Sequence, residues 1–235
     1  FRAFQAGRAD RRLWSEDPES AVGAYFDHYT KKARDPDTAA LLALTYRDRW
    51  KSLGKGRVLD IACGAGMLAE QAPEGARVFG VDRDPAAAAH VRRRCAVGSA
   101  TELPFPSASF DAVHCAHLIE HLTAPERLVR EIHRVLRPGG LAMILTPDIR
   151  RYGFDFWVDH THVRPFTPEG LTGLLTMHDF IDLRMEYGLF HETRIERWWR
   201  AILRPSHETV YALRKRLGRR HAGELICTAR KPAAP

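Results

Sequence analysis

The sequence has no apolar stretch long enough to cross a membrane. Its longest strongly apolar run, Leu141–Leu145, falls far short of the roughly 20 residues that a membrane-spanning helix needs. We therefore expect a soluble protein that does not bind a membrane. The sequence begins at Phe1 instead of methionine, which leaves room for a leader segment before it.

Cysteine is scarce, and the chain lacks repeats, low-complexity tracts and linkers. The four cysteines, Cys63, Cys95, Cys115 and Cys227, stand far apart and form no CxxC pair, so we expect a reduced, cytoplasmic protein. With 45% hydrophobic and 28% charged residues, the composition is that of a globular domain and excludes a disordered or fibrous chain. The net charge of +7 would attract an acidic metabolite or a nucleic acid, although such charge also serves solubility alone.

From Arg57 onward, strand and helix patterns alternate. Short apolar runs predict strands at VLDIA, VFGVD, DAVHCA and LAMILTP, and helices are expected to start at Asp84–Pro85 and at Ala124–Pro125. The Pro138–Gly139–Gly140 break should end the second helix. Such alternation predicts an α/β fold whose mostly parallel sheet is covered on both faces, with ligands at the carboxyl ends of the strands.

Further elements are expected on either side of this core. Two helices should precede it, one from about Pro18 and one from Pro36, the second capped by Asp35 and ended by Gly54.

After Pro147, a loop rich in aromatic residues and histidine leads to a helix started by Thr167. The alternating runs FIDLRMEYGLF and ELICTARK follow, and a basic, helical insertion between them contains Trp198, Trp199 and Tyr211.

The most informative stretch is Val58–Gly66, VLDIACGAG, in which an apolar strand leads into an acidic residue and a turn of small residues. Small side chains let the backbone approach a ligand, and the next helix supplies N–H groups, so the stretch predicts a nucleotide-type ligand. Asp82 follows Asp60 by about 22 positions, close to the spacing at which a second carboxylate reaches ribose hydroxyls. Ala62 and Met67 stand where the dinucleotide fingerprint has glycine, which disfavours an NAD enzyme.

From about Arg57 to Asp148 the chain resembles the type 11 branch of the class I S-adenosylmethionine-dependent methyltransferases. The resemblance rests on VLDIACGAG, LPFPSASFDAVHCAHLIEHL and IHRVLRPGGLAMILTP, and more loosely on THVRPFTPEGL and TARKP. It implies S-adenosylmethionine as cofactor and a single Rossmann-like domain of seven mostly parallel strands with an antiparallel C-terminal strand. Residues 1–54 would form an N-terminal helical lid, 55–148 the cofactor-binding core and 149–235 the acceptor side.

The resemblance also implies roles for individual positions. Cofactor contacts are implied for Asp60, Ala62, Gly64, Gly66, Asp82, Arg83, Ser99, Ala100, Cys115 and His117. Asp60 would hold the amino-acid portion of the cofactor, Asp82 would accept hydrogen bonds from both ribose hydroxyls, and Arg83 would lie against the adenine. Ala62 in place of glycine is a small departure from the family pattern, whereas Ser99 in place of aspartate weakens the expected contact with the adenine amine.

Methyl transfer from a sulfonium is a direct displacement, so the protein mainly aligns the acceptor and, where needed, removes its proton. His117 and His121 are four positions apart and are expected to share one face of a helix after DAVHCA. His121 stands where related phosphobase methyltransferases have a histidine that acts with a tyrosine. It is the first candidate for the base, with packing against the fold as the alternative.

The segment 155–166 supplies the second candidates. His160 and His162, two positions apart and near Asp159, are suited to deprotonate a hydroxyl. We expect no metal there, because no further ligand stands at a familiar spacing. Bracing of the helix that starts at Thr167 is the competing explanation.

The acceptor pocket is expected to be lined by Tyr25, Tyr29, Trp157 and Arg164. The two tyrosines would cover the sulfonium or simply dock the lid helix. The basic balance, with Arg150 and Arg151 near the mouth, predicts that acidic acceptors are preferred. We favour an oxygen acceptor because several histidines are available as bases.

Two other functions stay open. An RNA or tRNA methyltransferase would suit the basic charge, but HCAH after the third predicted strand differs from the NPPY-like motif used on amines of bases, and no RNA-binding module is visible. The other is a partner protein that keeps the fold without activity, against which the intact Asp60, Gly64, Gly66 and Asp82 argue. The sequence predicts neither the oligomeric state nor the identity of the acceptor.

Overall fold

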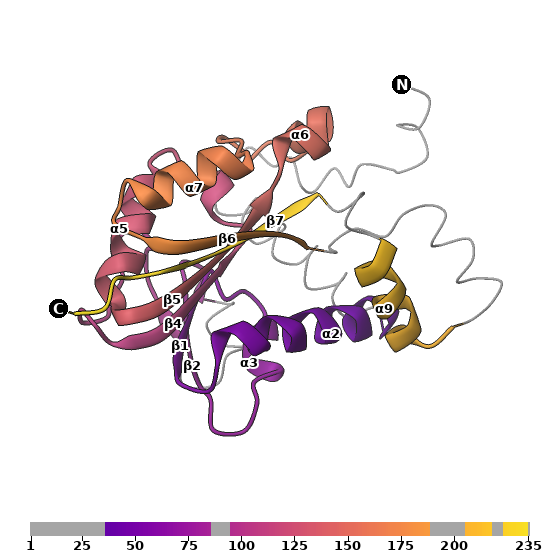
Figure 1. Cartoon of the computed structure of the whole chain (residues 1–235), viewed down its shortest axis with the longest axis horizontal. Coiled ribbons are helices and arrows are strands. Elements are labelled where there is room, and N and C mark those ends of the chain that lie inside the picture. Colours follow the sequence, from indigo (N-terminus) through magenta and orange to yellow (C-terminus); the bar gives the residue numbers. More distant parts are fainter. Residues whose placement is uncertain (1–35, 86–94, 189–204, 218–222, 235) are drawn as a thin grey trace.

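The computed structural model describes residues 36–85, 95–188, 205–217 and 223–234. They form a seven-stranded sheet in the order β3-β2-β1-β4-β5-β7-β6 (Figure 1). Strands β1 to β5 are paired in parallel, and β7 runs antiparallel to both β5 and β6. This confirms the predicted Rossmann-like sheet and its antiparallel C-terminal strand. The strands are β1 Arg57–Ile61, β2 Arg77–Asp82, β3 Cys95–Val97, β4 Phe110–Ala116, β5 Leu136–Pro147, β6 Ile181–Gly188 and β7 Glu224–Arg230.

Helices lie on both faces of the sheet. In Figure 1, α5 and α7 lie on one side, and α2, α3 and α9 lie on the other. The described helices are α2 Pro36–Leu53, α3 Met67–Glu70, α5 Pro125–Val135, α6 Ile149–Tyr152, α7 Pro168–Thr176 and α9 His207–Leu217, with 3-10 turns η3 Ile119–His121 and η4 Gly153–Val158. The helices expected from Pro18 and after Asp84–Pro85 fall outside the described residues.

The end signal of one helix and the start signal of another are confirmed, whereas the cap expected at Asp35 lies outside the described residues. α2 begins at Pro36, and Gly54, with φ of 76°, ends it by donating its N–H to the carbonyl of Trp50. α7 is capped by Thr167, whose side chain accepts a hydrogen bond from the backbone N–H of Gly170.

The central strands are buried on both faces, which explains their nearly continuous apolar sequences. On β1, Leu59 belongs to the core cluster beneath α5 and α7, whereas its neighbour Val58 packs in the cluster that contains Trp50 of α2. Because side chains alternate along a strand, Asp60 of β1 and His114 of β4 face α2 as well. The side chains of Asp60 and His114 therefore lie in the part of the core between the sheet and α2.

The turn after β4 differs from its prediction. His117 has φ of 52°, in the left-handed region, and only the 3-10 turn Ile119–His121 follows before α5 begins at Pro125. A left-handed residue interrupts a right-handed helix. The prediction that His117 and His121 share a helix face was therefore wrong.

Two other boundaries also differ. α5 ends at Val135, ahead of the Pro138–Gly139–Gly140 break, because Leu136 already adopts an extended conformation and pairs with Phe110 of β4. Part of the stretch expected as a loop after Pro147 is helical, in α6 and η4.

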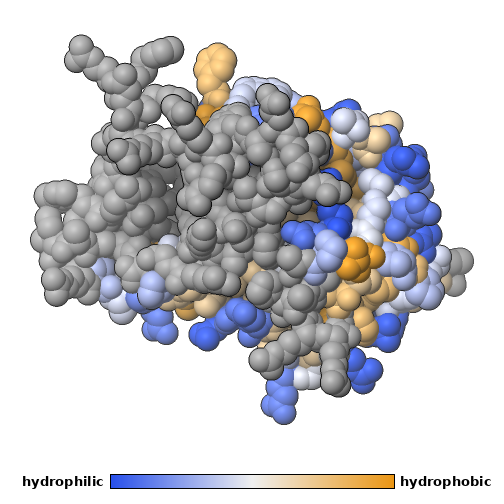
Figure 2. Space-filling view, turned by 180° about the vertical axis from the view of Figure 1, so that it is seen from behind, coloured by the Kyte–Doolittle hydropathy of each residue, from blue (hydrophilic) through white to orange (hydrophobic). Residues whose placement is uncertain are grey.

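Figure 2 shows the molecule from behind the view of Figure 1. On the side where α5 lies, hydrophilic side chains are mixed with smaller apolar patches. In the described part of the chain, no helix is both long enough and apolar enough to span a membrane.

Candidate active site

The carboxyl ends of β1 and β4 lie side by side where the strand order reverses, the place where ligands bind in open α/β sheets. The turn after β1 has three residues with left-handed φ, namely Ala62 at 56°, Gly64 at 49° and Gly66 at 77°. A Cβ added at Gly64 would meet no atom within 4 Å, so open space adjoins the backbone there. The turn therefore presents bare backbone to a ligand.

Asp82, at the end of β2, is fixed beside this turn. Its Oδ2 accepts a hydrogen bond of 3.0 Å from the backbone N–H of Gly64, and its Oδ1 accepts one of 3.0 Å from the N–H of Asp84. Each carboxylate oxygen keeps a further lone pair. Two aligned acceptors next to an open glycine turn fit the ribose of S-adenosylmethionine.

Asp60 is buried in a pair that the sequence did not predict. Only 4% of Asp60 is exposed, and its Oδ1 lies 2.7 Å from Nδ1 of His114. Nε2 of His114 is in turn 3.5 Å from a terminal nitrogen of Arg49, on α2. One oxygen of Asp60 is thus engaged within the protein, on the face that α2 covers.

Next to this pair, charged side chains form a buried network. Oε1 of Glu224 lies 3.3 Å from a terminal nitrogen of Arg49 and 2.8 Å from Nε2 of His117, whose Nδ1 is 3.5 Å from Oε1 of Glu120. Burial raises the pKa of Glu224, but Arg49 and His117 outweigh it and hold the pKa below its usual value. Two cationic and two anionic groups thus face one another next to the ends of β4 and β5.

The network makes His117 unsuitable as a base. Burial lowers the pKa of His117, but the hydrogen bonds and charges of Glu120 and Glu224 outweigh it and raise the pKa to about 9. The imidazole is therefore protonated at neutral pH and donates from both nitrogens. A doubly protonated imidazole cannot take a proton from the molecule that is to be methylated.

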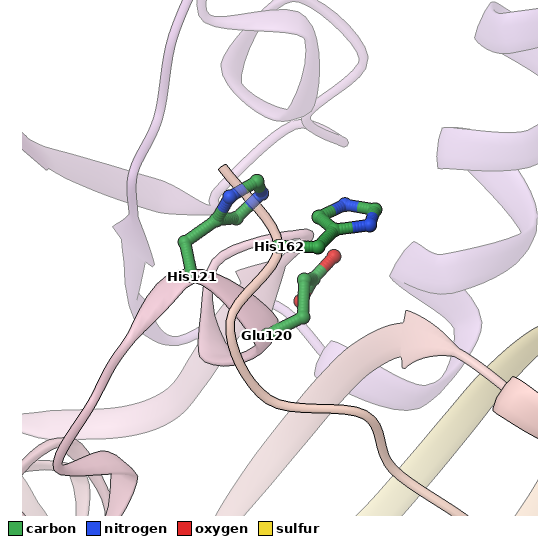
Figure 3. Close-up of side chains that lie close together, drawn as sticks. All are labelled: Glu120, His121 and His162. Carbon is green, nitrogen blue, oxygen red and sulfur yellow. The ribbon is translucent and has the colours of Figure 1, made fainter. Parts of the chain in front are cut away.

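His121 and His162 lie together, as Figure 3 shows. Their ring centroids are 4.8 Å apart, and both residues are half-buried. Burial lowers the pKa of His121 below its usual value, which keeps the ring neutral at neutral pH. The structure thus brings together one predicted base from each of two segments about 40 residues apart in sequence.

The other predicted catalytic and pocket residues are more scattered. His160 is exposed, and so are Trp157 and Arg164, with Trp157 at 51%. Arg150 pairs with Glu169 at 3.2 Å and with Asp148 at 3.5 Å, whereas Arg151 lies over the ring of Tyr187 at 3.4 Å. Tyr25 and Tyr29 fall outside the described residues.

Among the remaining cofactor positions, Arg83 and Ser99 are exposed and Ala100 is half-buried. Oγ of Ser99 bonds to Oγ1 of Thr101 at 2.9 Å and accepts the Thr101 N–H at 3.2 Å, so this side chain shapes a local turn. Cys115 is fully buried in β4, with its backbone included.

Sequence reasoning missed several side chains of the buried charged cluster: Arg49, His114, Glu120 and Glu224. Glu120 had the clearest signal, because it immediately precedes His121 in an otherwise apolar run, LIEHL. Arg49 and Glu224 are far apart in sequence and become partners only when α2 packs against the sheet.

Comparisons with known proteins agree with this geometry. Residues 59–144 match the family model described as a methyltransferase domain. A SAM-dependent methyltransferase from Archaeoglobus fulgidus superposes with a TM-score of 0.65 over 88% of this chain and 100% of that one, and at 22% identity the likeness shows the fold. The fold is that of the class I S-adenosylmethionine-dependent methyltransferases. Within it, residues 59–144 are similar to the methyltransferase domains of the type 11 branch.

Two curated relatives match the core. A probable S-adenosylmethionine-dependent methyltransferase of Mycobacterium tuberculosis is 40% identical over 146 residues, which are 59% of this chain and 53% of the relative. A ubiquinone biosynthesis O-methyltransferase of Pseudomonas aeruginosa is 33% identical over 119 residues, which are 45% of this chain and 50% of the relative. The chain thus spans about half the length of these relatives. The matches agree with the predicted cofactor.

Proposed function

We propose that the chain transfers the methyl group of S-adenosylmethionine to an oxygen atom of a small acceptor bound beyond the carboxyl ends of β4 and β5. The observation that carries this proposal is the half-buried pair of His121 and His162 beside the turn that follows β4. A hydroxyl must lose its proton to become methylated, and neutral imidazoles assist such a loss, whereas a neutral amine can attack without it. The likeness to an O-methyltransferase of Pseudomonas aeruginosa supports the choice of oxygen.

The proposed roles follow from position. When bound, the cofactor supplies an electrophilic methyl group on a sulfonium. The turn of Ala62, Gly64 and Gly66 would hold its amino-acid portion, and Asp82 its ribose. Because His160 is exposed, we assign the loss of the acceptor's proton to His121 and His162 instead.

We further propose that the acceptor is anionic. Arg150 is paired with Glu169, and Arg151 lies over the ring of Tyr187. Both therefore support an anionic acceptor less than the sequence suggested. Arg164 supports it more, because it is exposed on the segment that contains His162.

The test uses matched acceptors that differ only in a hydroxyl or an amine at the reacting position. The purified chain is incubated with S-adenosylmethionine, and both demethylated cofactor and methylated product are quantified by mass spectrometry. We expect turnover of the hydroxyl member of a pair, and a loss of roughly 10²–10⁴-fold in His121→Ala. Cofactor affinity, measured by calorimetry with S-adenosylhomocysteine, should stay unchanged in that variant.

His178→Ala is the matched control, because His178 follows α7 and its Nδ1 bonds to the carbonyl of Leu174, away from the cluster. Turnover of the amine members alone would contradict oxygen methylation. Normal turnover of hydroxyl acceptors by His121→Ala would remove His121 from the reaction.

A further inference from the structure

Three potential metal ligands converge beside the turn after β4. Glu120, His121 and His162 each offer one ligand atom, and these atoms lie within 4.8 Å of one another. Figure 3 shows the three side chains lying close together, although they come from two separate segments. Glu120 is buried and the two histidines are half-buried, so this is not an accidental gathering of exposed groups.

One oxygen of the Glu120 carboxylate is held only by a long ion pair with His117. Oε2 accepts a hydrogen bond of 3.0 Å from Oγ1 of Thr146, but Oε1 has no hydrogen bond to any described residue. The side chain of Glu120 is 0% exposed, and Nδ1 of His117 comes no closer than 3.5 Å to Oε1. The protonated His117 thus faces Oε1 only at the distance of a long ion pair, and the buried carboxylate can accept a second cation from its other side.

The chain holds His162 in the tautomer that a metal requires. Its Nδ1 lies 2.6 Å from the carbonyl oxygen of Phe156. A carbonyl only accepts, so Nδ1 must carry the proton and Nε2 the lone pair. Oδ2 of Asp159 is 3.8 Å from this Nε2 and offers a further oxygen at the edge of the cluster.

His121 is fixed in the same tautomer. Oγ1 of Thr161 donates its only hydrogen to Oδ1 of Asp159 at 2.6 Å, and it must therefore accept the bond of 2.9 Å from Nδ1 of His121. The carbonyl of Thr161, at 3.2 Å, also accepts from Nδ1. Imidazoles held through Nδ1 by chain oxygens, with Nε2 turned to the ion, are the usual outer contacts of metal-binding histidines.

We propose that Glu120, His121 and His162 bind a divalent cation, and that the cation binds the acceptor's reacting oxygen. Two imidazoles and one carboxylate suit a first-row cation such as Mn²⁺ or Zn²⁺ better than Ca²⁺, which prefers oxygen ligands alone. Three protein ligands leave coordination positions for an acceptor. The site itself stands on this geometry, whereas the part about the acceptor rests on the proposed function.

The proposed step needs no reagent other than the cation, the acceptor, S-adenosylmethionine and water. Coordination lowers the pKa of the acceptor's hydroxyl, and its proton passes to water. The oxygen then attacks the methyl carbon, the new O–C bond forms as the C–S bond breaks, and the sulfonium leaves as a neutral thioether. With the cation bound, His121 and His162 act as ligands and promote the loss of the acceptor's proton through the cation, in place of accepting that proton themselves.

The test measures metal binding independently of activity. The full chain is stripped with a chelator, dialysed and titrated with Mn²⁺ in the presence of S-adenosylhomocysteine, with free Mn²⁺ followed by electron paramagnetic resonance, and then with Zn²⁺ by calorimetry. We expect one site per chain, weakened at least about tenfold in Glu120→Gln and in His162→Ala. His178→Ala should bind as the parent does, and melting temperatures with unchanged S-adenosylhomocysteine affinity show that each variant is folded.

The outcomes separate the site from the reaction. Absence of saturable binding of both ions, or equal binding by the parent and the two ligand variants, would overturn the site. Hydroxyl methylation that runs at an undiminished rate in excess chelator would overturn the cation's part in the reaction and leave His121 as the base. A chain that binds the cation but methylates only amines would support the site and contradict oxygen methylation.

Discussion

Asp82 is the residue whose geometry bears most directly on cofactor binding. Both of its carboxylate oxygens are oriented by backbone N–H groups, from Gly64 and Asp84, so the side chain needs little rearrangement to accept ribose hydroxyls. We predict that Asp82→Ala weakens S-adenosylhomocysteine binding by about 1.5–3 kcal/mol, or roughly 10- to 150-fold. Calorimetry on the purified chain measures it.

Asp84→Ala provides the control, because Asp84 contacts Asp82 through its backbone N–H, which the substitution retains. Equal affinity of Asp82→Ala and the parent would mean that the ribose binds elsewhere.

Helix α5 fixes the segment that follows Ser99 and Ala100. Glu131 accepts the N–H of Leu103 at 2.6 Å, and Arg134 donates to the carbonyls of Leu103 and Phe105. Hydrogen bonds from Arg134 lower the pKa of Glu131, against a smaller opposing effect of burial. A lowered pKa means that this stabilisation is present above the usual pKa of 4.5 and is lost as the pH falls through the lower folded-state value.

We therefore predict that Glu131→Gln lowers the free energy of unfolding by about 1–2 kcal/mol at pH 7, and that the difference shrinks below about pH 4.5. Urea unfolding of parent and variant across that range measures it, with Glu126→Gln on the same helix as control. A difference that is independent of pH would show that Glu131 acts through packing alone.

The charge of the whole molecule bears on how an acceptor arrives. A net charge of +7 and a pI of about 9.5 favour encounter with anions, and this long-range attraction is screened at a Debye length of about 10 Å in 0.1 M salt. We predict that kcat/KM for an anionic hydroxyl acceptor falls several-fold between about 0.05 and 0.5 M salt. A neutral analogue of the same shape should change little. Parallel salt dependence for both would point to an effect on the protein itself and would remove the preference for acidic acceptors.

The strands, turns and helix starts of the core could be predicted because their sequence signals are local. Apolar runs that end in Asp60 and Asp82, the small-residue turn between Ala62 and Gly66, and Pro36 or Thr167 at helix starts each act within a few residues. Their physical causes are backbone sterics, capping and burial on both faces of a sheet, all of which depend on short stretches of sequence. Strand β3, with three residues, was too short to give such a signal.

The candidate site was only partly predictable, because its contacts join distant segments. His121 and His162 were candidates from sequence, but their meeting, and the convergence of Glu120 with them, depends on how η3 and the segment after η4 pack. His117 shows the difference most clearly. Its sequence neighbours suggested a helix, whereas its φ is left-handed. Two buried carboxylates raise its pKa to about 9, so that its ring is a cation at neutral pH.

The sequence by itself therefore determined the strand and helix pattern, the glycine turn and the carboxylate at the end of β2. Only the tertiary structure decided which histidine is charged, which is neutral, and which three side chains can share an ion. Protonation and coordination depend on burial and on charges within a few ångströms. These distances are set by packing between parts of the chain that are far apart in sequence.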